Sequence, residues 1–211
     1  MITTSLCSLL DIDFPIINAP MTGTATSELA TAVSKAGAFG MIGATLTPDP
    51  SWLKEQIQAV KEKTDKPFGV GFISSATSME RNIDAALDAK VDAISHSFAD
   101  PTPFIEQAKG SGVKVFAQVQ TMADAKKAVT AGADVIVAQG NEAGGHTSYL
   151  GTMSFVRAVV KIAGDIPVVA AGGIIGRIKE IKGPYVSIEV SENITFKLQK
   201  TAIANTLPKG T

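Results

Sequence analysis

The sequence predicts an α/β fold in which parallel strands alternate with helices, as in a barrel. Short apolar segments recur with midpoints about 20 to 33 residues apart, which is the length of a βα unit rather than of a hairpin. Most of them are apolar throughout, as expected for strands that a parallel sheet buries on both faces. The expected strands are Pro15–Ile17, Phe39–Ile42, Phe68–Phe72, Val91–Ser95, Val113–Val119, Val135–Ala138 and Pro167–Ala170.

The segments between these strands have the spacing of amphipathic helices. Residues Ser51–Lys63 place Trp52 and Val60 near one face of a helix, with charged residues elsewhere. Residues Thr121–Ala131 form a second such helix, and Gly132 follows as its predicted C-cap. Repetition of strand, loop, helix and glycine turn indicates a (β/α) TIM-type barrel with about seven βα units and the eighth missing.

After Ile174 the pattern changes to a period of two, which is typical of an antiparallel sheet with one wet face. Turn-forming residues at 182–184 and 191–193 separate the alternating runs. The charge changes as well, because residues 174–211 carry a net charge of +3 and residues 1–173 a net charge of −4. The alternating apolar residues are Val186, Ile188, Val190, Ile194, Phe196 and Leu198.

These changes predict a domain boundary close to Gly173. Residues 1–173 would form the incomplete barrel, and residues 174–211 would form a short antiparallel β tail.

Composition excludes several classes of protein. The 211 residues carry a net charge of −1, which gives no electrostatic footprint for nucleic acid. The single cysteine, Cys7, forms no internal disulfide, and with two histidines it makes no convincing metal site, so no metal is expected. Residues Met1–Phe14 lack the basic start of a signal peptide, and no stretch reaches the roughly 18 apolar residues of a membrane span. A cytoplasmic protein is therefore expected.

The most informative loop is Gln139–His146, which follows the predicted strand Val135–Ala138, at the end of a barrel strand where active sites lie. Gly144 and Gly145 permit close backbone approach to an anion or a ring edge. His146 would then present an imidazole as a base or a hydrogen-bond donor. The alternative, that the glycines only turn the chain and His146 is a solvated residue, has about even weight on this evidence.

Other strand ends carry weaker signals. Gly172 and Gly173 follow the last predicted barrel strand, where barrels often bind phosphate, although a simple turn is also consistent with them. Asn18–Gly23 offers backbone groups and Met21 to a flat ligand, and core packing of Met21 is the alternative. His96 either lines the barrel mouth or is a structural histidine.

Several motifs together resemble the nitronate monooxygenase family, formerly called 2-nitropropane dioxygenase, over about residues 12–175. That resemblance implies FMN, molecular oxygen, and conversion of alkyl nitronates or nitroalkanes to carbonyl compounds with nitrite. The same family includes FMN-dependent enoyl-acyl-carrier-protein reductases, so an enoyl thioester is an alternative substrate. The motifs are Pro15–Met21, Lys66–Val70, Gln118–Gln120, Ala131–Asp134, Gln139–His146 and Pro167–Ile174.

The resemblance also implies roles for matching residues. His146 would be the catalytic base or the anchor of the nitronate. Met21 would lie beside the flavin, and Gly172 and Gly173 would bind its phosphate. The full set of implied FMN contacts is Ala19, Pro20, Met21, Gln118, Gln139, Gly144, Gly145, Gly172 and Gly173.

The chain also departs from the family. Many members carry asparagine where this chain has Gly71, and the family continues past its Gly-Gly-Ile with a helix and an eighth strand. Residues 172–211 instead resemble the C-terminal part of YajC, the accessory subunit of the Sec translocon, which indicates a fusion at this tripeptide. A truncated barrel without catalysis is therefore a second functional hypothesis, with translocon association only if the tail acts like YajC. Homo-oligomer formation is left open.

Overall fold

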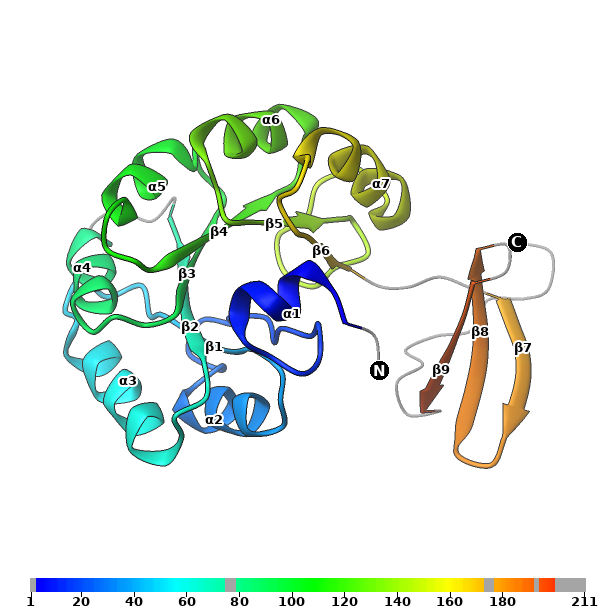
Figure 1. Cartoon of the computed structure of the whole chain (residues 1–211), viewed down its shortest axis with the longest axis horizontal. Helices are drawn as coiled ribbons and strands as arrows, with labels where there is room; N and C mark the ends of the chain where they lie inside the picture. The colour runs from blue at the N-terminus through cyan, green and yellow to red at the C-terminus, as the bar shows by residue number, and fades with distance from the viewer. Residues whose placement is uncertain (1–2, 75–78, 173–176, 192–193, 200–211) are drawn as a thin grey trace. The chain divides into compact units, whose positions relative to one another are not determined.

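A computed structural model describes residues 3–74, 79–172, 177–191 and 194–199 (Figure 1). The chain divides into two compact units, Met1–Gly172 and Gly173–Thr211. The described strands of the first unit form a six-stranded sheet, and those of the second form a three-stranded sheet.

The first unit is an open (β/α) barrel, which confirms the predicted fold class. Its strands are all parallel and follow chain order across the sheet, from β1 to β6. Helices α2 to α7 cover the convex side of this curved sheet, and one helix precedes each strand in the chain (Figure 1). The strands are β1 Gly40–Gly43, β2 Phe68–Ile73, β3 Ala93–Ser97, β4 Lys114–Val119, β5 Val135–Gln139 and β6 Val168–Ala171. The helices are α2 Ser27–Lys35, α3 Ser51–Lys63, α4 Glu80–Asp88, α5 Thr102–Ala108, α6 Met122–Ala131 and α7 Thr152–Ala163.

The predicted first strand, Pro15–Ile17, is reduced to an isolated parallel bridge between Ile17 and Phe39, so the prediction of a full strand was wrong. The side chain of Asn18 takes over the pairing: its Oδ1 accepts from the amide of Met41 at 2.7 Å, and its Nδ2 donates to the Met41 carbonyl at 2.9 Å. Proline at positions 15 and 20 offers no backbone N–H for a longer ladder. The segment therefore follows the edge of β1 without forming a strand.

The other edge of the sheet is β6. Val168 and Val169 are only half-buried and Ala170 is exposed, whereas β1 to β5 are buried over most of their length. An apolar strand with this exposure marks the place where a further βα unit would continue a closed barrel.

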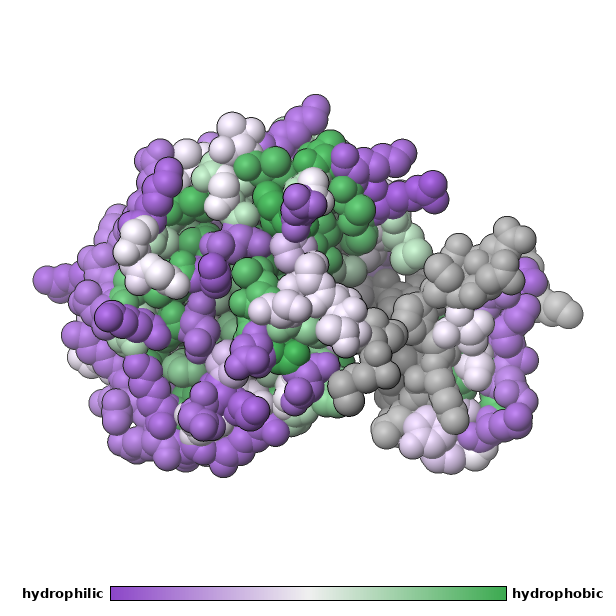
Figure 2. Space-filling view, in the orientation of Figure 1, coloured by the Kyte–Doolittle hydropathy of each residue, from purple (hydrophilic) through white to green (hydrophobic). Residues whose placement is uncertain are grey.

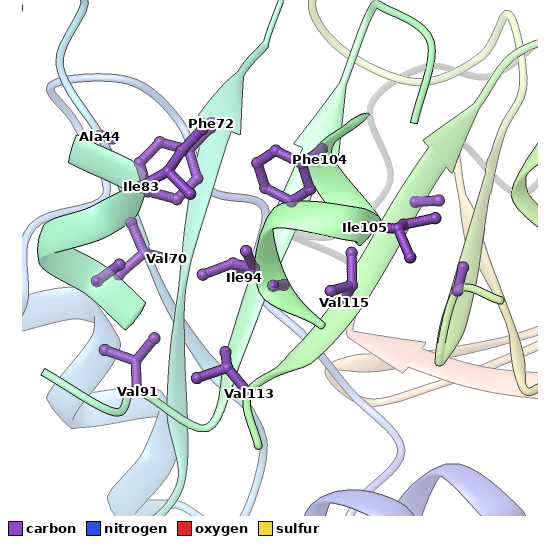
Figure 3. Packing of buried hydrophobic residues seen from close by; sticks show 14 of the residues in the cluster. Ala44, Val70, Phe72, Ile83, Val91, Ile94, Phe104, Ile105, Val113 and Val115 are labelled. Atoms are coloured by element: carbon purple, nitrogen blue, oxygen red, sulfur yellow. The ribbon is translucent and has the colours of Figure 1, made fainter. Parts of the chain in front are cut away.

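The main core lies between the sheet and its outer helices. Figure 3 shows apolar side chains of the strands meeting those of α4 and α5, with Ile94 and Val70 among them. The rings of Phe72 on β2 and Phe104 on α5 lie 6.1 Å apart. In the view of Figure 2, hydrophilic residues gather over the outer helices, as expected for amphipathic helices with one buried face.

A second core fills the concave side of the sheet near the beginnings of the strands. The short helix α1, Ser5–Leu10, packs here, and the rings of Phe39 and Phe116 lie 5.5 Å apart. Cys7 is a buried free thiol of this core. The concave side of the sheet near the amino ends of the strands is therefore filled with apolar side chains.

The second unit has the antiparallel pattern expected from the sequence. Strands β7 Arg177–Lys182, β8 Tyr185–Ser191 and β9 Ile194–Gln199 pair in that order. Val186 and Ile188 of β8 are buried, while Ser187 and Glu189 between them are half-buried. Gly183 turns the β7–β8 hairpin in the left-handed region, with φ +55°.

His96 lies on the outer face of β3, where its ring packs 5.3 Å from that of Phe104. The structural interpretation of this residue therefore holds, because the side chain is fully buried away from the barrel mouth. Its Nε2 is 2.8 Å from the carbonyl oxygen of Ala99, and its Nδ1 has no partner within the described residues. Burial lowers the pKa of His96, against the opposing effects of the Ala99 carbonyl and of Asp100 and Asp124.

This burial predicts a loss of stability in mild acid. The pKa of His96 in the folded protein lies below its value in the unfolded chain. The contribution of neutral His96 to the free energy of unfolding is therefore complete above about pH 6.5 and is lost as the pH falls toward the folded pKa. One such group changes the free energy of unfolding by up to about 1.4 kcal/mol per pH unit. Urea titrations between pH 7.5 and 5 should show a flatter pH dependence for His96→Phe than for the native chain. Equal slopes for the two proteins would contradict the prediction.

Candidate active site

The carboxyl ends of the six parallel strands meet at one edge of the sheet, which we call the carboxyl rim: Gly43, Ile73, Ser97, Val119, Gln139, Ala171 and the loops that follow them. In βα barrels the loops at this end form the active site.

Three glutamines form a connected cluster at the rim. Gln118 on β4 and Gln120 just after it each donate from Nε2 to Oε1 of Gln139 at 2.7 Å. Ser97 at the end of β3 joins this hydrogen-bond network, because its hydroxyl donates to Oε1 of Gln118 at 3.1 Å. Gln139 is buried, and its Nε2 donates to the carbonyl of Gly144 at 3.3 Å. We call Gln118, Gln120 and Gln139 the glutamine cluster.

The loop after β5 is tied to this cluster at His146. Nε2 of Gln120 donates to the main-chain oxygen of His146 at 2.5 Å. The imidazole itself is exposed and meets the ring of Phe98 edge-on, with centroids 5.8 Å apart and an interplanar angle of 72°. Gly144 and Gly145 face open space, and Gly145 has φ +78°. Backbone groups of the loop are therefore accessible to a ligand at the rim.

The same loop is also held to the start of α7, through Glu142. Its Oε2 accepts from the backbone amide of Thr152 at 2.7 Å and from the Thr152 hydroxyl at 2.6 Å, at the first residue of α7. The hydroxyl bond holds the pKa of Glu142 below its usual value, and burial opposes this only partly. Glu142 is thus a structural carboxylate that caps α7, a role that the glycine-histidine pattern did not predict.

Ala19, Pro20 and Met21 lie over the ends of β1 and β2. A Cβ on Gly43 would lie 2.3 Å from the carbonyl oxygen of Met21, so this close approach requires glycine. A Cβ on Gly71 would lie 2.3 Å from the ring of Pro20, which explains why asparagine is absent here: it would displace the segment. Met21 is 46% exposed, so it is a surface residue rather than core filler.

The structure thus brings most of the predicted site residues to one rim. Gln118, Gln139, Gly144 and His146 are joined by hydrogen bonds, directly or through Gln120. Gly172 directly follows β6 and has φ +153°, and a Cβ there would lie 2.1 Å from the Thr152 hydroxyl. Gly173 lies outside the described residues. Sequence reasoning missed Phe98, which lies three residues beyond the predicted strand Val91–Ser95 and directly after the observed β3.

A small hollow of about 220 Å³ opens at the rim beside the cluster. It is lined by Phe98, Ala99, Gln118, Gln120 and Asp124. A larger hollow of about 390 Å³ lies among the beginnings of β4 and β5, at Lys114 and Asp134, which is the wrong end of the strands for barrel chemistry. The smaller hollow is the one at the end of the strands where βα barrels carry their active sites.

Within the described residues, no group of three or more His, Cys, Asp or Glu side chains could hold a metal ion. In the same part of the chain, no helix has the length and hydrophobicity to cross a bilayer.

The fold and the rim define a TIM-type α/β barrel protein with a polar, glycine-rich carboxyl end. The sequence model of the nitronate monooxygenase family matches residues 3–81 and 72–183, and the chain belongs to this family. This confirms the resemblance of the barrel. The resemblance of residues 172–211 to YajC is not borne out, since the family match itself runs to residue 183.

Similar proteins carry several activities. A Rhodococcus jostii protein named "(3aS,4S,5R,7aS)-5-hydroxy-7a-methyl-1-oxo-octahydro-1H-indene-4-carboxyl-CoA dehydrogenase" is 34% identical, over 81% of this chain and 48% of its own length. A probable nitronate monooxygenase of Staphylococcus saprophyticus is 32% identical, over 82% of this chain and 61% of its own length.

Solved structures show the same barrel. FabK from Thermotoga maritima superposes with a TM-score of 0.76 and 34% identity, over 80% of this chain and 53% of that protein. Nitroalkane oxidase from Streptomyces ansochromogenes superposes with a TM-score of 0.69 and 26% identity, over 82% of this chain and 62% of that protein. The chain therefore spans about half to three fifths of the length of these relatives.

Proposed function

We propose that the chain is an FMN-dependent oxidoreductase that converts alkyl nitronates to carbonyl compounds and nitrite with molecular oxygen. The observation that carries the proposal is the tie between His146 and the glutamine cluster at the carboxyl rim, through Gln120. Membership of the nitronate monooxygenase family supports the reaction class. As part of the proposal, the protein works in the cytoplasm.

The chemistry of the rim residues suits FMN. The amides of Gln118 and Gln139 are donors and acceptors of the kind that the polar edge of an isoalloxazine ring needs. The side chain of Met21, an exposed residue, can pack on a flat ring, beside Ala19 and Pro20. Gly144 and Gly145 leave open space above the strand ends, and the backbone after β6, at Gly172, would hold the phosphate.

When bound, FMN would supply the redox chemistry, and the protein would bind and orient the substrate. Neutral His146 would remove the α-proton of a nitroalkane through an imidazole nitrogen, or its N–H would donate to the nitro oxygens of a nitronate. The glutamine cluster would hold the loop that carries this imidazole. The hollow beside Phe98 would receive part of the substrate.

An FMN-dependent enoyl reductase is the second candidate. It is favoured by the likeness to FabK, which is 34–36% identical in two structures. It is also favoured by the CoA thioester in the name of the Rhodococcus relative. In this case reduced nicotinamide would be consumed and an enoyl thioester would take the place of the nitronate.

The deciding experiment starts from flavin binding. Purified chain, titrated with FMN, should bind it and show a flavin absorbance spectrum; it is then supplied with nitroethane nitronate, and oxygen uptake and nitrite are measured. Nitrite release supports the proposal, and NADH oxidation with crotonyl-CoA but no nitrite would replace it with the second candidate. A chain that rejects FMN would overturn both and favour a barrel without catalysis.

A further inference from the structure

Phe98 has an unusual backbone for a bulky residue. Its φ is +67°, in the left-handed region that few residues other than glycine, asparagine and aspartate adopt. In the described part of the chain, Asp11 and Lys90 share this feature, but both end a helix, where a left-handed residue is a common cap. Phe98 instead follows directly on strand β3, at the carboxyl rim.

The left-handed turn gives the Phe98 ring two neighbours. One is the imidazole of His146, which it meets edge-on at 5.8 Å. The other is the hollow of about 220 Å³, which Phe98 lines together with Gln118 and Gln120. Because Gln120 also bonds the main-chain oxygen of His146, loops after β3 and β4 hold the same residue from two sides. Backbone strain that persists at such a position is commonly retained for a site.

The hollow has a mixed lining. Phe98 and Ala99 supply carbon surface, and Gln118, Gln120 and Asp124 supply polar atoms. Its volume lies below the usual range of pockets for drug-sized ligands, so it suits a chain of a few carbon atoms. If the alkyl group of the substrate packed on the Phe98 ring, the carbon that bears the nitro group would lie toward His146, which this ring contacts.

We propose that Phe98 is a binding and positioning residue: its ring holds the imidazole of His146 and forms the wall that receives the alkyl arm of the substrate. The substrate part of this inference rests on the proposed function. The contact between the Phe98 ring and the imidazole of His146 does not depend on the proposed function.

The test compares Phe98→Gly with Phe98→Tyr and Lys90→Gly. Glycine at 98 keeps the left-handed backbone and removes the ring, whereas tyrosine keeps the ring. Lys90→Gly removes the backbone strain of a left-handed residue that does not lie at the carboxyl rim. It therefore controls for the effect of relieving such strain without removing the Phe98 ring.

The first readout needs neither flavin nor activity. The chain has two histidines, so its NMR spectrum contains two imidazole Cε1–H resonances, and a His96 variant assigns them. The resonance of His146 should be displaced by the Phe98 ring current, retain this shift in Phe98→Tyr and Lys90→Gly, and lose it in Phe98→Gly. The His96 resonance, beside Phe104, should stay unchanged. An unmoved His146 resonance in Phe98→Gly would overturn the positioning role.

The second readout uses FMN-loaded protein and a series of 1-nitroalkane nitronates from two to four carbons. On an apolar wall each methylene should raise kcat/KM by about fourfold. This dependence should vanish in Phe98→Gly and persist in Phe98→Tyr and Lys90→Gly. The same dependence in Phe98→Gly as in Lys90→Gly would overturn the substrate role. Inactivity of all four proteins would instead contradict the proposed function and leave the resonance test to decide the contact with His146.

Discussion

Replacing His146 with alanine is expected to lower turnover of nitroethane by a factor of about 10² to 10⁴, the usual contribution of a positioned general base. FMN should stay bound, because the hydrogen bond that ties this residue to the glutamine cluster goes to its main-chain oxygen, which alanine retains. The side chain is exposed, so the melting temperature should change little. Nitrite release, flavin absorbance and thermal unfolding measure the three quantities.

A second substitution separates the two roles of the imidazole. Asparagine at 146 can donate a hydrogen bond to nitro oxygens but cannot take up a proton at neutral pH. If His146 is the base, His146→Asn should fail with neutral nitroethane and recover with the preformed nitronate. If it is only an anchor, both substrates should retain most of their turnover. Native turnover of both substrates by His146→Ala would remove His146 from the mechanism.

Elements with a strong local pattern could be predicted from the sequence. Helix α3 has the predicted limits, Ser51–Lys63, because apolar and charged residues alternate at helical spacing along its whole length. Gly132 caps the end of α6 as expected, with φ +87°. Thr121, predicted as the first residue of this helix, is instead its N-cap, where its hydroxyl accepts from the amide of Asp124. Pro15–Ile17 failed because a side chain, that of Asn18, competes with the backbone for the edge of β1.

The site was predictable only within one loop. Gly144, Gly145 and His146 are neighbours in sequence, so their pattern alone predicts a ligand-facing turn. The contacts of His146 with Phe98 and Gln120 join loops that follow three different strands, and no local pattern records them. The position of His96 could have been inferred, since side chains alternate across a strand and Ser97 faces the glutamine cluster.

Gly140, the glycine directly after β5, is expected to be the least replaceable residue of the loop. An added Cβ would lie 2.1 Å from the hydroxyl of Thr152, 2.4 Å from its Cα and 2.5 Å from its backbone nitrogen. Two of these atoms belong to the backbone at the start of α7, so a change of rotamer cannot relieve the clash. Gly140→Ala should therefore lower the free energy of unfolding by about 3 kcal/mol or more, at the upper end of overpacking effects.

Gly144→Ala is the matched control, because the same substitution in the same loop meets no heavy atom within 4 Å. Its free energy of unfolding should stay within about 0.5 kcal/mol of the native value. Urea titration of both variants and the native chain measures the difference. A Gly140 variant as stable as the Gly144 variant would show that α7 shifts freely away from β5. In that case the bonds from Thr152 to Glu142 would not fix the loop that carries His146.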